Sequence, residues 1–311
     1  MIASTTISTA RRILTQARRN KSCSCAVRTL ITSQSSEPHA YLRPFLQSNQ
    51  DADKENEGLE GVMCLVLDRP ETKNALSVRM VGEMRESIAK LNSMSSTAAR
   101  VLLVNSAQPN MFCAGADLKE RRTMSLEQVS AFLDSLRSLL RELEEIKIPS
   151  IGVIDGYALG GGAELSLACD MRVGGENTKI ALPESKLGII PGAGGTQRLT
   201  HLIGASKAKE LIFTGRHIDG IEAERIGLIN KYVPNPHSPL QAALLLSKQI
   251  STSAPLSIQA SKKAINAAVT LPLEEGLDME RKLYDSLLHT KDRKEGLEAF
   301  KEKRKAVFTG Q

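Results

Sequence analysis

Short apolar runs alternate along this chain with longer segments of helical spacing. Four apolar runs predict buried strands, at residues 62–67, 101–104, 150–154 and 171–173. Three segments between and after these runs have the apolar spacing of helices, at residues 77–91, 125–146 and 164–169. Ser77 is expected to cap the first of these helices, and Pro149 follows the end of the second. Strands that alternate with helices predict an α/β fold with central sheets.

The pattern changes toward both ends of the chain. From about residue 239 only helical spacing is present, so we expect a C-terminal helical region at 239–311 behind a core at 59–238. Residues 37–58 include QSNQDADKENEG, and their low hydrophobicity predicts a polar linker. No apolar run approaches the roughly 20 residues that a helix needs to span a bilayer, so no membrane partner is expected.

The first 36 residues account for the whole net positive charge. They contain six Lys and Arg residues and no Asp or Glu, which leaves 35 basic against 35 acidic residues in the rest of the chain. A segment that is rich in Arg, Ser and Thr and free of acids is typical of a mitochondrial transit peptide, so 1–36 is excluded from the fold and a matrix protein is expected. Nucleic acid is not an expected partner, because its binding needs a basic face on the folded domain.

Cysteine and histidine show no pattern of a metal site or of nucleophilic catalysis. Cys64, Cys113 and Cys169 lie outside the first segment, and an odd number at wide spacing is typical of reduced thiols. Cys113 has no neighbouring His, which favours a packing role over that of a nucleophile. No metal is expected, and carboxylates are better candidates than histidines for acid–base chemistry.

Three segments are rich in small residues: MFCAGADLKE at 111–120, DGYALGGGAEL at 155–165 and LGIIPGAGGT at 187–196. Glycines between a strand and a helix let the backbone approach a ligand closely, and free N–H groups at a helix start suit a developing negative charge. A phosphate loop is the rival interpretation, but neither GxxxxGK[ST] nor a good GxGxxG spacing is present. Donors from two such segments, if they converge, form an oxyanion hole.

Two carboxylates lie close to these glycines in the sequence. Glu164 falls in the first predicted helical turn after the triple glycine, and Glu184 follows Leu182-Pro183. A carboxylate among apolar residues is costly to bury unless it is paired or functional. From the pattern alone, Glu164 either stabilises the helix dipole or takes part in chemistry, and Glu184 either lies in a surface turn or does the same.

These segments resemble the signature regions of the enoyl-CoA hydratase/isomerase (crotonase) superfamily. The similarity runs from about Met63 to Phe308 and includes FCAGADLKER, GYALGGGAELSLACD, PESKLGIIPGAGGTQRL and KDRKEGLEAFKEKR. Within the superfamily the chain most resembles the mitochondrial methylglutaconyl-CoA hydratase branch and the similar hydratase domain-containing proteins. The resemblance implies a spiral of ββα units with a C-terminal helical trimerisation region, assembled as a homotrimer or homohexamer.

The resemblance also assigns catalytic roles by motif position. It implies that the N–H groups of Ala116 and Gly161 bind the thioester oxygen of an acyl-CoA. It further implies that Glu164 and Glu184 hold the catalytic water. Two carboxylates that share a site favour one ionised and one protonated state. We expect Glu164 to act mainly as the base toward water and Glu184 as the proton donor to the α-carbon, while the reverse sharing stays open.

Further positions are implied to contact the substrate. Ala114, Asp117 and Gly160 are expected beside the CoA moiety and the channel that it occupies. Phe300 and Lys303, near the C-terminus, are expected to reach CoA bound to a neighbouring subunit. The CoA belongs to the substrate, so no separate cofactor is expected.

The implied activity is hydration of a short or branched enoyl-CoA, with 3-methylglutaconyl-CoA as a candidate, in fatty-acid or branched-chain amino-acid (leucine) catabolism. The alternatives are an enoyl-CoA isomerase, which needs one carboxylate, a hydrolase relative, and an RNA-binding relative of the fold. The usual signature of the last is a basic helix, and the helix at 79–90 is close to neutral. Lys119, Arg121 and Arg122 either pair with a carboxylated acyl chain or form a solvated helix face.

Overall fold

The computed structural model describes residues 37–46 and 57–311, and the predicted transit peptide at 1–36 lies outside them. Glu37–Gln311 forms one compact unit. The helical region that begins near residue 239 therefore belongs to the same unit as the core.

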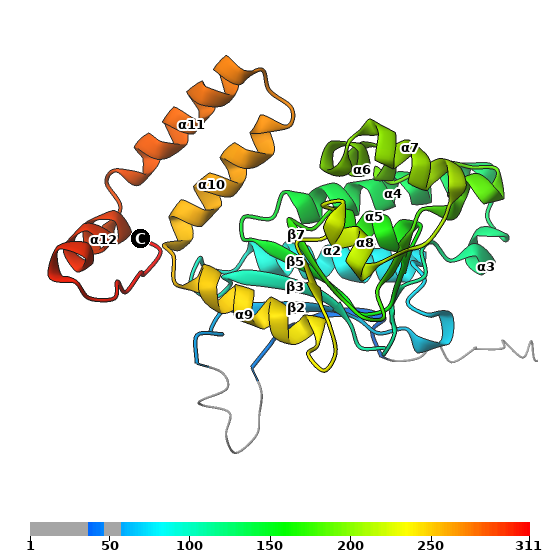
Figure 1. The fold of residues 1–311 in the computed structure, drawn as a ribbon, viewed down its shortest axis with the longest axis horizontal. Coiled ribbons are helices and arrows are strands. Elements are labelled where there is room, and N and C mark those ends of the chain that lie inside the picture. Colours follow the sequence, from blue (N-terminus) through cyan, green and yellow to red (C-terminus); the bar gives the residue numbers. More distant parts are fainter. Residues whose placement is uncertain (1–36, 47–56) are drawn as a thin grey trace, which may run out of the picture. The chain divides into compact units, whose positions relative to one another are not determined.

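Two sheets form the centre of this unit (Figure 1). The six-stranded sheet has the order β1-β2-β3-β5-β7-β10, with bounds Ala40–Pro44, Val62–Leu67, Val101–Ser106, Ser150–Ile154, Met171–Gly175 and Lys231–Val233. The four-stranded sheet has the order β4-β6-β8-β9, with bounds Met111–Cys113, Tyr157–Leu159, Lys179–Ala181 and Ile218–Asp219. From β3 to β8, successive strands alternate between the two sheets. The chain thus winds as a spiral, which confirms the predicted α/β fold.

The strands that the apolar runs predict are all present in the larger sheet. All neighbouring strands of this sheet from β2 to β10 pair in parallel. Every residue of β2 and β5 is buried. Parallel strands buried on both faces read as continuous apolar runs, which is why they are visible in the sequence. The short strands of the smaller sheet give no such signal.

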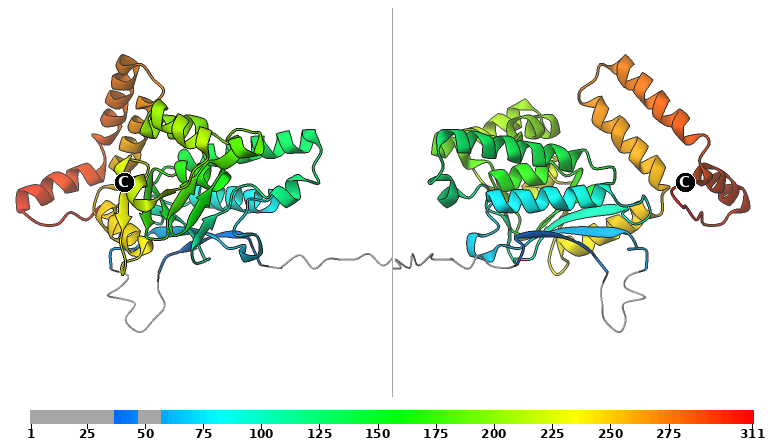
Figure 2. Two further views of the ribbon diagram at one scale, coloured as in Figure 1. Left: turned by 45° about the vertical axis from the view of Figure 1, so that its right-hand side comes forward. Right: turned by 180° about the vertical axis from the view of Figure 1, so that it is seen from behind.

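Helices cover the sheets, and local capping fixes where several of them begin (Figure 2). Ser77 accepts a hydrogen bond from the Met80 amide at the start of α2, and Ser125 forms a capping box with Gln128 at the start of α4. The helical elements up to residue 225 are η1 Pro70–Thr72, α2 Val78–Asn92, α3 Leu118–Arg121, α4 Leu126–Glu144, α5 Gly161–Leu167, η2 Pro183–Leu187, α6 Gly195–Ile203, α7 Ala205–Thr214 and α8 Gly220–Arg225.

Residues 40–44 form a strand, so the prediction of a polar linker was wrong for this part of 37–58. β1 runs antiparallel to β2, with Ala40 opposite Leu67 and Pro44 opposite Met63. The carboxylate of Glu83 also accepts the amide of Ala40 at 3.0 Å. β1 lies at the sheet edge and buries only its first residue fully, so its order comes from its neighbour and its own sequence carries little apolar signal.

Four helices follow β10, as the sequence predicts: α9 Pro239–Ser251, α10 Pro255–Ala268, α11 Leu273–Leu287 and α12 Lys291–Glu302. α9 packs on the larger sheet through Ala242 and Ala243, whereas α10 and α11 form an antiparallel hairpin (Figures 1 and 2). The chain end folds back onto α12, where the Asp292 carboxylate accepts the amides of Thr309 and Gly310.

Candidate active site

One cavity brings the three small-residue segments together. It has a volume of about 550 Å³, and its walls come from the β4–α3 loop, α3, α4, the start of α5, η2 and the loop after η2. Its lining side chains are apolar except for Arg121, Glu164 and Glu184. Another cavity of about 590 Å³ lies between α10, α11 and residues 145–147, but no predicted site residue lines it.

Two backbone amides form a pair at the cavity wall. A Cβ added to Gly161 would stand 3.4 Å from the Ala116 nitrogen, and one added to Gly115 would stand 3.3 Å from the Gly161 nitrogen. Within residues 37–46 and 57–311, neither the Ala116 nor the Gly161 N–H donates to a protein acceptor. Gly161 is the first residue of α5, so its amide also lies at the positive end of a helix. This pair has the composition of an oxyanion hole.

Glycine is required where these two segments meet. Gly115 has φ +97°, and a side chain there would put its Cβ 2.7 Å from the Leu159 carbonyl oxygen. At Gly162, a Cβ would stand 2.2 Å from the carbonyl oxygen of Cys113. Because any side chain at either position collides with backbone, the small residues seen in the sequence are what allows the two donors to approach each other.

Glu164 is a buried carboxylate held by backbone amides. It is 3% exposed, and its Oε1 accepts the N–H groups of Ala193 and Gly195, each at 2.8 Å. Burial raises the pKa of Glu164, and the amides of Gly195 and Ala193 oppose that rise. Among the described residues, hydrogen bonds engage only its Oε1, which leaves Oε2 for a ligand.

Glu184 lines the same cavity, but fewer hydrogen bonds stabilise its ionised form than stabilise that of Glu164. It belongs to η2, and its Oε2 is buried without a hydrogen-bond partner among the described residues. Its Oε1 lies over the site backbone, because a Cβ at Gly160 would stand 3.1 Å from it. Burial, with a further contribution from the Glu164 charge, raises the pKa of Glu184 to about 7. Near neutral pH this side chain therefore holds or releases a proton readily.

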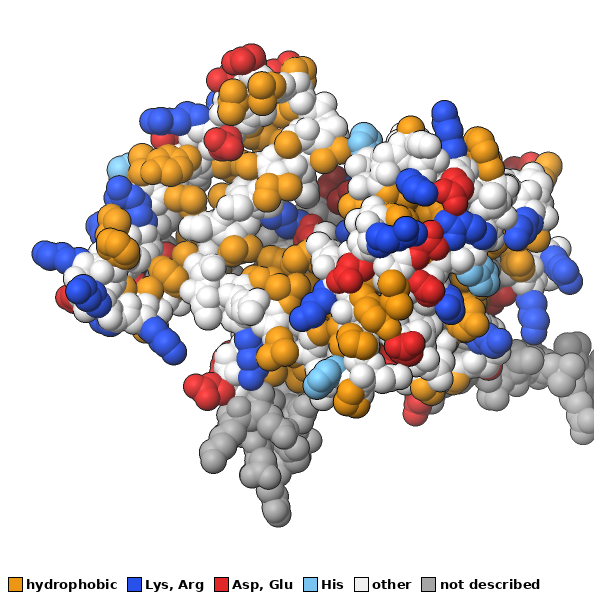
Figure 3. Space-filling view, in the orientation of Figure 1, with side chains coloured by type: hydrophobic (Ala, Val, Ile, Leu, Met, Phe, Trp, Pro, Cys, Tyr) orange, Lys and Arg blue, Asp and Glu red, His pale blue; other side chains and the backbone are white. Residues whose placement is uncertain are grey.

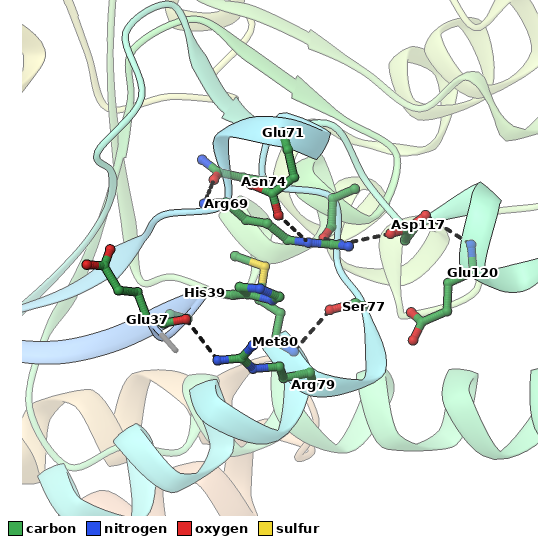
Figure 4. A network of polar contacts seen from close by, with 12 residues as sticks. Glu37, His39, Arg69, Glu71, Asn74, Ser77, Arg79, Met80, Asp117 and Glu120 are labelled. Carbon is green, nitrogen blue, oxygen red and sulfur yellow. Dashed lines mark hydrogen bonds and ion pairs between the residues drawn. The ribbon is translucent and has the colours of Figure 1, made fainter. Parts of the chain in front are cut away.

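The predicted substrate-contacting residues divide into two groups. Ala114 and Gly160 line the cavity with the catalytic candidates. Asp117 does not: it caps α3, and its carboxylate pairs with Arg69 (Figure 4). Phe300 and Lys303 lie at the end of α12, where Phe300 is 85% exposed.

The sequence marks 187–196 as a small-residue segment, but it assigns several site residues no role of their own. Ala193 and Gly195 act through their amides, and the Arg198 guanidinium donates to the Ala193 carbonyl at 3.0 Å while it pairs with Glu144. Leu133 of α4 lines the cavity although α4 looks like an ordinary amphipathic helix. Backbone amides and apolar walls depend on tertiary approach, and no single residue type marks them.

The position of Cys113 supports the packing role that the sequence favours. Cys113 is buried and donates to the Asn74 carbonyl, and burial raises the pKa of its thiol to about 12, as suits a packing residue.

In the part of the chain that the structure describes, no cluster of His, Cys, Asp and Glu suits a metal ion. None of the helices described there is long and apolar enough to cross a membrane.

The fold places two backbone amides and two carboxylates around one cavity, an arrangement that suits an enzyme acting on a carbonyl compound. Residues 57–311 match the model of the enoyl-CoA hydratase/isomerase family. The chain belongs to the enoyl-CoA hydratase/isomerase family, as the sequence resemblance predicts.

Named relatives agree with this assignment. The chain is 48% identical over 250 residues to a probable mitochondrial enoyl-CoA hydratase 2 of Arabidopsis thaliana, covering 80% of this chain and 82% of that protein. It is 41% identical over 254 residues to human mitochondrial methylglutaconyl-CoA hydratase, covering 81% and 74%. The crystal structure of an enoyl-CoA hydratase from Bacillus anthracis superposes with a TM-score of 0.78 at 42% identity, covering 81% and 96%.

Proposed function

We propose that this protein is an enoyl-CoA hydratase that adds water across the α,β-double bond of an acyl-CoA thioester. One observation carries the proposal: a buried carboxylate, a half-buried carboxylate and two backbone amides without a partner among the described residues line a single cavity. The thioester oxygen accepts hydrogen bonds from the amides of Ala116 and Gly161. The CoA is part of the substrate, and the chemistry needs no separate cofactor.

The amides activate the β-carbon. As water adds there, charge moves onto the thioester oxygen and the transition state resembles an enolate. Donors fixed in place stabilise that charge without reorganisation, and the loss of one such donor typically costs about 2.7–4 kcal/mol. Ala116 and Gly161 supply donors that the protein backbone itself holds in place.

The two glutamates divide the proton transfers. Glu164 has two amides on Oε1 that stabilise its ionised form, so it acts as the base toward water through Oε2. Glu184 has a pKa of about 7 and a buried Oε2 without a partner, so it donates its proton to the α-carbon. The unequal hydrogen bonding of the two carboxylates supports this division over the reverse one.

Substitution of each glutamate tests the proposal. Glu164→Gln and Glu184→Gln keep the side-chain volume and remove the acid–base group, so each variant retains CoA binding and loses about 10²–10⁴-fold in kcat. The double variant is little worse than the poorer single variant, because the two groups act as a unit. Hydration of crotonyl-CoA by Glu164→Gln at the wild-type rate would falsify the two-carboxylate mechanism.

Isomerase activity makes a different prediction for the same variants. Migration of a double bond needs one carboxylate to carry a proton between two carbons, so one of the two substitutions leaves it intact. The RNA-binding alternative gains no support from α2, whose Arg79 and Arg85 pair with Glu83 and Glu142.

The substrate is a short or branched enoyl-CoA, and 3-methylglutaconyl-CoA is the candidate that we propose to test first. Arg121 is the one cation among the cavity-lining residues, and no ion pair or side-chain hydrogen bond occupies its guanidinium in the described structure. Lys119 and Arg122 are exposed and do not line the cavity. A guanidinium on an apolar wall matches a carboxylate at the far end of an acyl chain. Such a substrate places the enzyme in leucine catabolism.

Hydration rates for 3-methylglutaconyl-CoA and crotonyl-CoA test this choice. Arg121→Met lowers kcat/KM for the carboxylated substrate by about 10- to 150-fold, the usual range for hydrogen bonds to a charged group, and changes the neutral substrate little. Arg122→Met, the matched control, affects neither. Equal losses for both substrates, together with weaker binding of free CoA, place Arg121 against the CoA phosphates instead.

The assembly that we propose is a homotrimer or homohexamer. α11 buries none of its residues, and exposed apolar side chains recur along the C-terminal helices (Figure 3). These side chains are Ile265, Val269, Leu273, Leu277, Tyr284, Leu297 and Phe300, exposed by 46–85%. A neighbouring subunit would cover them and bring its CoA to Phe300 and Lys303. Light scattering at micromolar concentration tests the assembly, and a monomeric mass contradicts it.

We propose the mitochondrial matrix as the location of the enzyme. The first 36 residues have the composition of a transit peptide, and the relatives from Arabidopsis and human are named as mitochondrial. N-terminal sequencing of the protein from isolated organelles tests this, with cleavage expected before about residue 58. Retention of Met1 in the organellar protein is the contrary result.

A further inference from the structure

The segment that carries the Ala116 amide is clamped by the loop between β2 and α2. The Leu76 N–H donates to the Gly115 carbonyl at 2.7 Å, and the Asp117 N–H donates to the Leu76 carbonyl at 3.0 Å. These bonds engage the residues on either side of Ala116, as in a parallel bridge. The Ala116 N–H therefore points away from Leu76 and toward the cavity.

Arg69 lies outside the cavity and binds both of these segments, the β2–α2 loop and the residue after Ala116 (Figure 4). Its Nη1 donates to Asp117 Oδ2 at 2.8 Å and to the Ala75 carbonyl at 2.8 Å, so one guanidinium joins both sides of the clamp. The Arg69 and Asp117 side chains are only 14% and 7% exposed. Asn74, fully buried, adds to the same connection by accepting the Arg69 amide at 2.7 Å and donating to the Phe112 carbonyl at 3.0 Å.

Charge gives Arg69 a second effect on the same amide. The Asp117 carboxylate belongs to the residue directly after Ala116, and burial alone would raise its pKa. Hydrogen bonds from the Glu120 amide and from Arg69 outweigh burial and lower the pKa, so the carboxylate stays ionised. An unpaired anion beside the oxyanion hole would oppose negative charge on the thioester oxygen. The guanidinium neutralises it at close range.

We propose that Arg69 is a positioning residue for the proposed hydration, which holds the Ala116 amide on the thioester oxygen through Asp117 and the Ala75 carbonyl. Arg69 touches neither the substrate nor the reacting atoms. It acts on the barrier by fixing the location of one oxyanion donor and by cancelling the charge next to it. The inference rests on the proposed hydratase function.

The test compares Arg69→Met with Arg85→Met. Arg85→Met also removes an ion pair, the one with Glu142, but that pair is exposed and joins α2 to α4. A misplaced donor costs up to about 100-fold, so Arg69→Met lowers kcat for crotonyl-CoA hydration by about 10- to 100-fold while KM changes less than about 3-fold. Arg85→Met keeps wild-type kinetics.

A spectroscopic measurement separates positioning from simple loss of folded enzyme. The carbonyl stretch of a bound, carbonyl-labelled acyl-CoA shifts to lower frequency when the hole polarises it. In Arg69→Met this band returns toward its value in free solution, whereas partial unfolding scales kcat and leaves the band of the bound complex unchanged. Asp117→Asn keeps the helix cap and removes the ion pair together with the carboxylate charge, so it loses only the positioning effect. Its band moves in the same direction and its kcat falls by less than that of Arg69→Met, and the double variant is no worse than Arg69→Met.

Three outcomes decide whether Arg69 is a positioning residue, even if Arg69→Met folds poorly. Arg69→Lys, which retains the charge and one contact, recovers part of the lost kcat if the proposal is right. Wild-type kcat in Arg69→Met or Asp117→Asn overturns it, as does a lowered kcat with an unchanged carbonyl band. Absence of hydration by the wild-type enzyme for every enoyl-CoA is a different result, since it overturns the proposed function itself.

Discussion

Gly195→Ala should displace Glu164, the proposed catalytic base, although it adds a single methyl group. Gly195 begins α6, and its φ lies outside the left-handed region, so the backbone accepts alanine. The new Cβ would stand 3.0 Å from both Cγ and Oε1 of Glu164 and 2.9 Å from Cβ of Pro191. Real Cβ contacts rarely come this close, so the Glu164 carboxylate must move away from the amides that bind it.

The size of the effect follows from those amides. Gly195 and Ala193 each donate to Glu164 Oε1 at 2.8 Å. A hydrogen bond to a charged group is worth about 1.5–3 kcal/mol, so losing one raises the pKa of Glu164 further. Because the base must be ionised, the acidic limb of the pH profile should move upward, and at a pH well below that limb kcat/KM should fall by about 10- to 150-fold.

The assay is the pH dependence of kcat/KM, followed through the absorbance of the conjugated enoyl thioester. Gly82→Ala makes the same chemical change on the exposed face of α2, with nothing within 4 Å of the new Cβ, and serves as the matched control. Its profile should coincide with the wild type. An acidic limb that stays in place in Gly195→Ala would show that the amides do not set the ionisation of Glu164.

Three further outcomes concern stability. Glu184→Gln should raise Tm more at pH 8 than at pH 5. The folded protein holds the Glu184 proton up to a pKa of about 7, whereas the unfolded chain releases it near 4.5, so the wild type loses stability as the pH rises through this range and the glutamine variant does not. Equal Tm shifts at the two pH values in calorimetry would contradict this. Lys262→Met should lower the free energy of unfolding by about 1.5–3 kcal/mol in urea titrations, because the nearly buried Lys262 pairs with Asp170 at 2.7 Å. The control Lys263→Met should change the free energy of unfolding by less than about 0.5 kcal/mol. Gly82→Ala should raise the same free energy by about 0.5–1 kcal/mol, and a decrease would contradict helix propensity as the cause.

The sequence by itself determined four of the six strands in the larger sheet, and it singled out most of the catalytic candidates. β2 and β5 are visible because parallel strands that are buried on both faces need an unbroken apolar run. Ser77 and Ser125 mark helix starts because their caps are local. Glu164 stands out as a candidate because a carboxylate among apolar residues is costly to bury unless it is paired or functional.

Tertiary structure alone decided where those candidates lie and which groups surround them. β1 is ordered by pairing with β2, and the strands of the smaller sheet are too short to give a periodic signal. The Ala116 and Gly161 amides become a pair only because glycines let two segments touch, and Glu184 acquires its pKa of about 7 only through burial beside Glu164. Asp117, expected in the channel, instead meets Arg69, 48 residues earlier in the chain. Backbone donors, desolvation and ion pairs depend on distances in space, and residue type and spacing along the chain do not encode those distances locally.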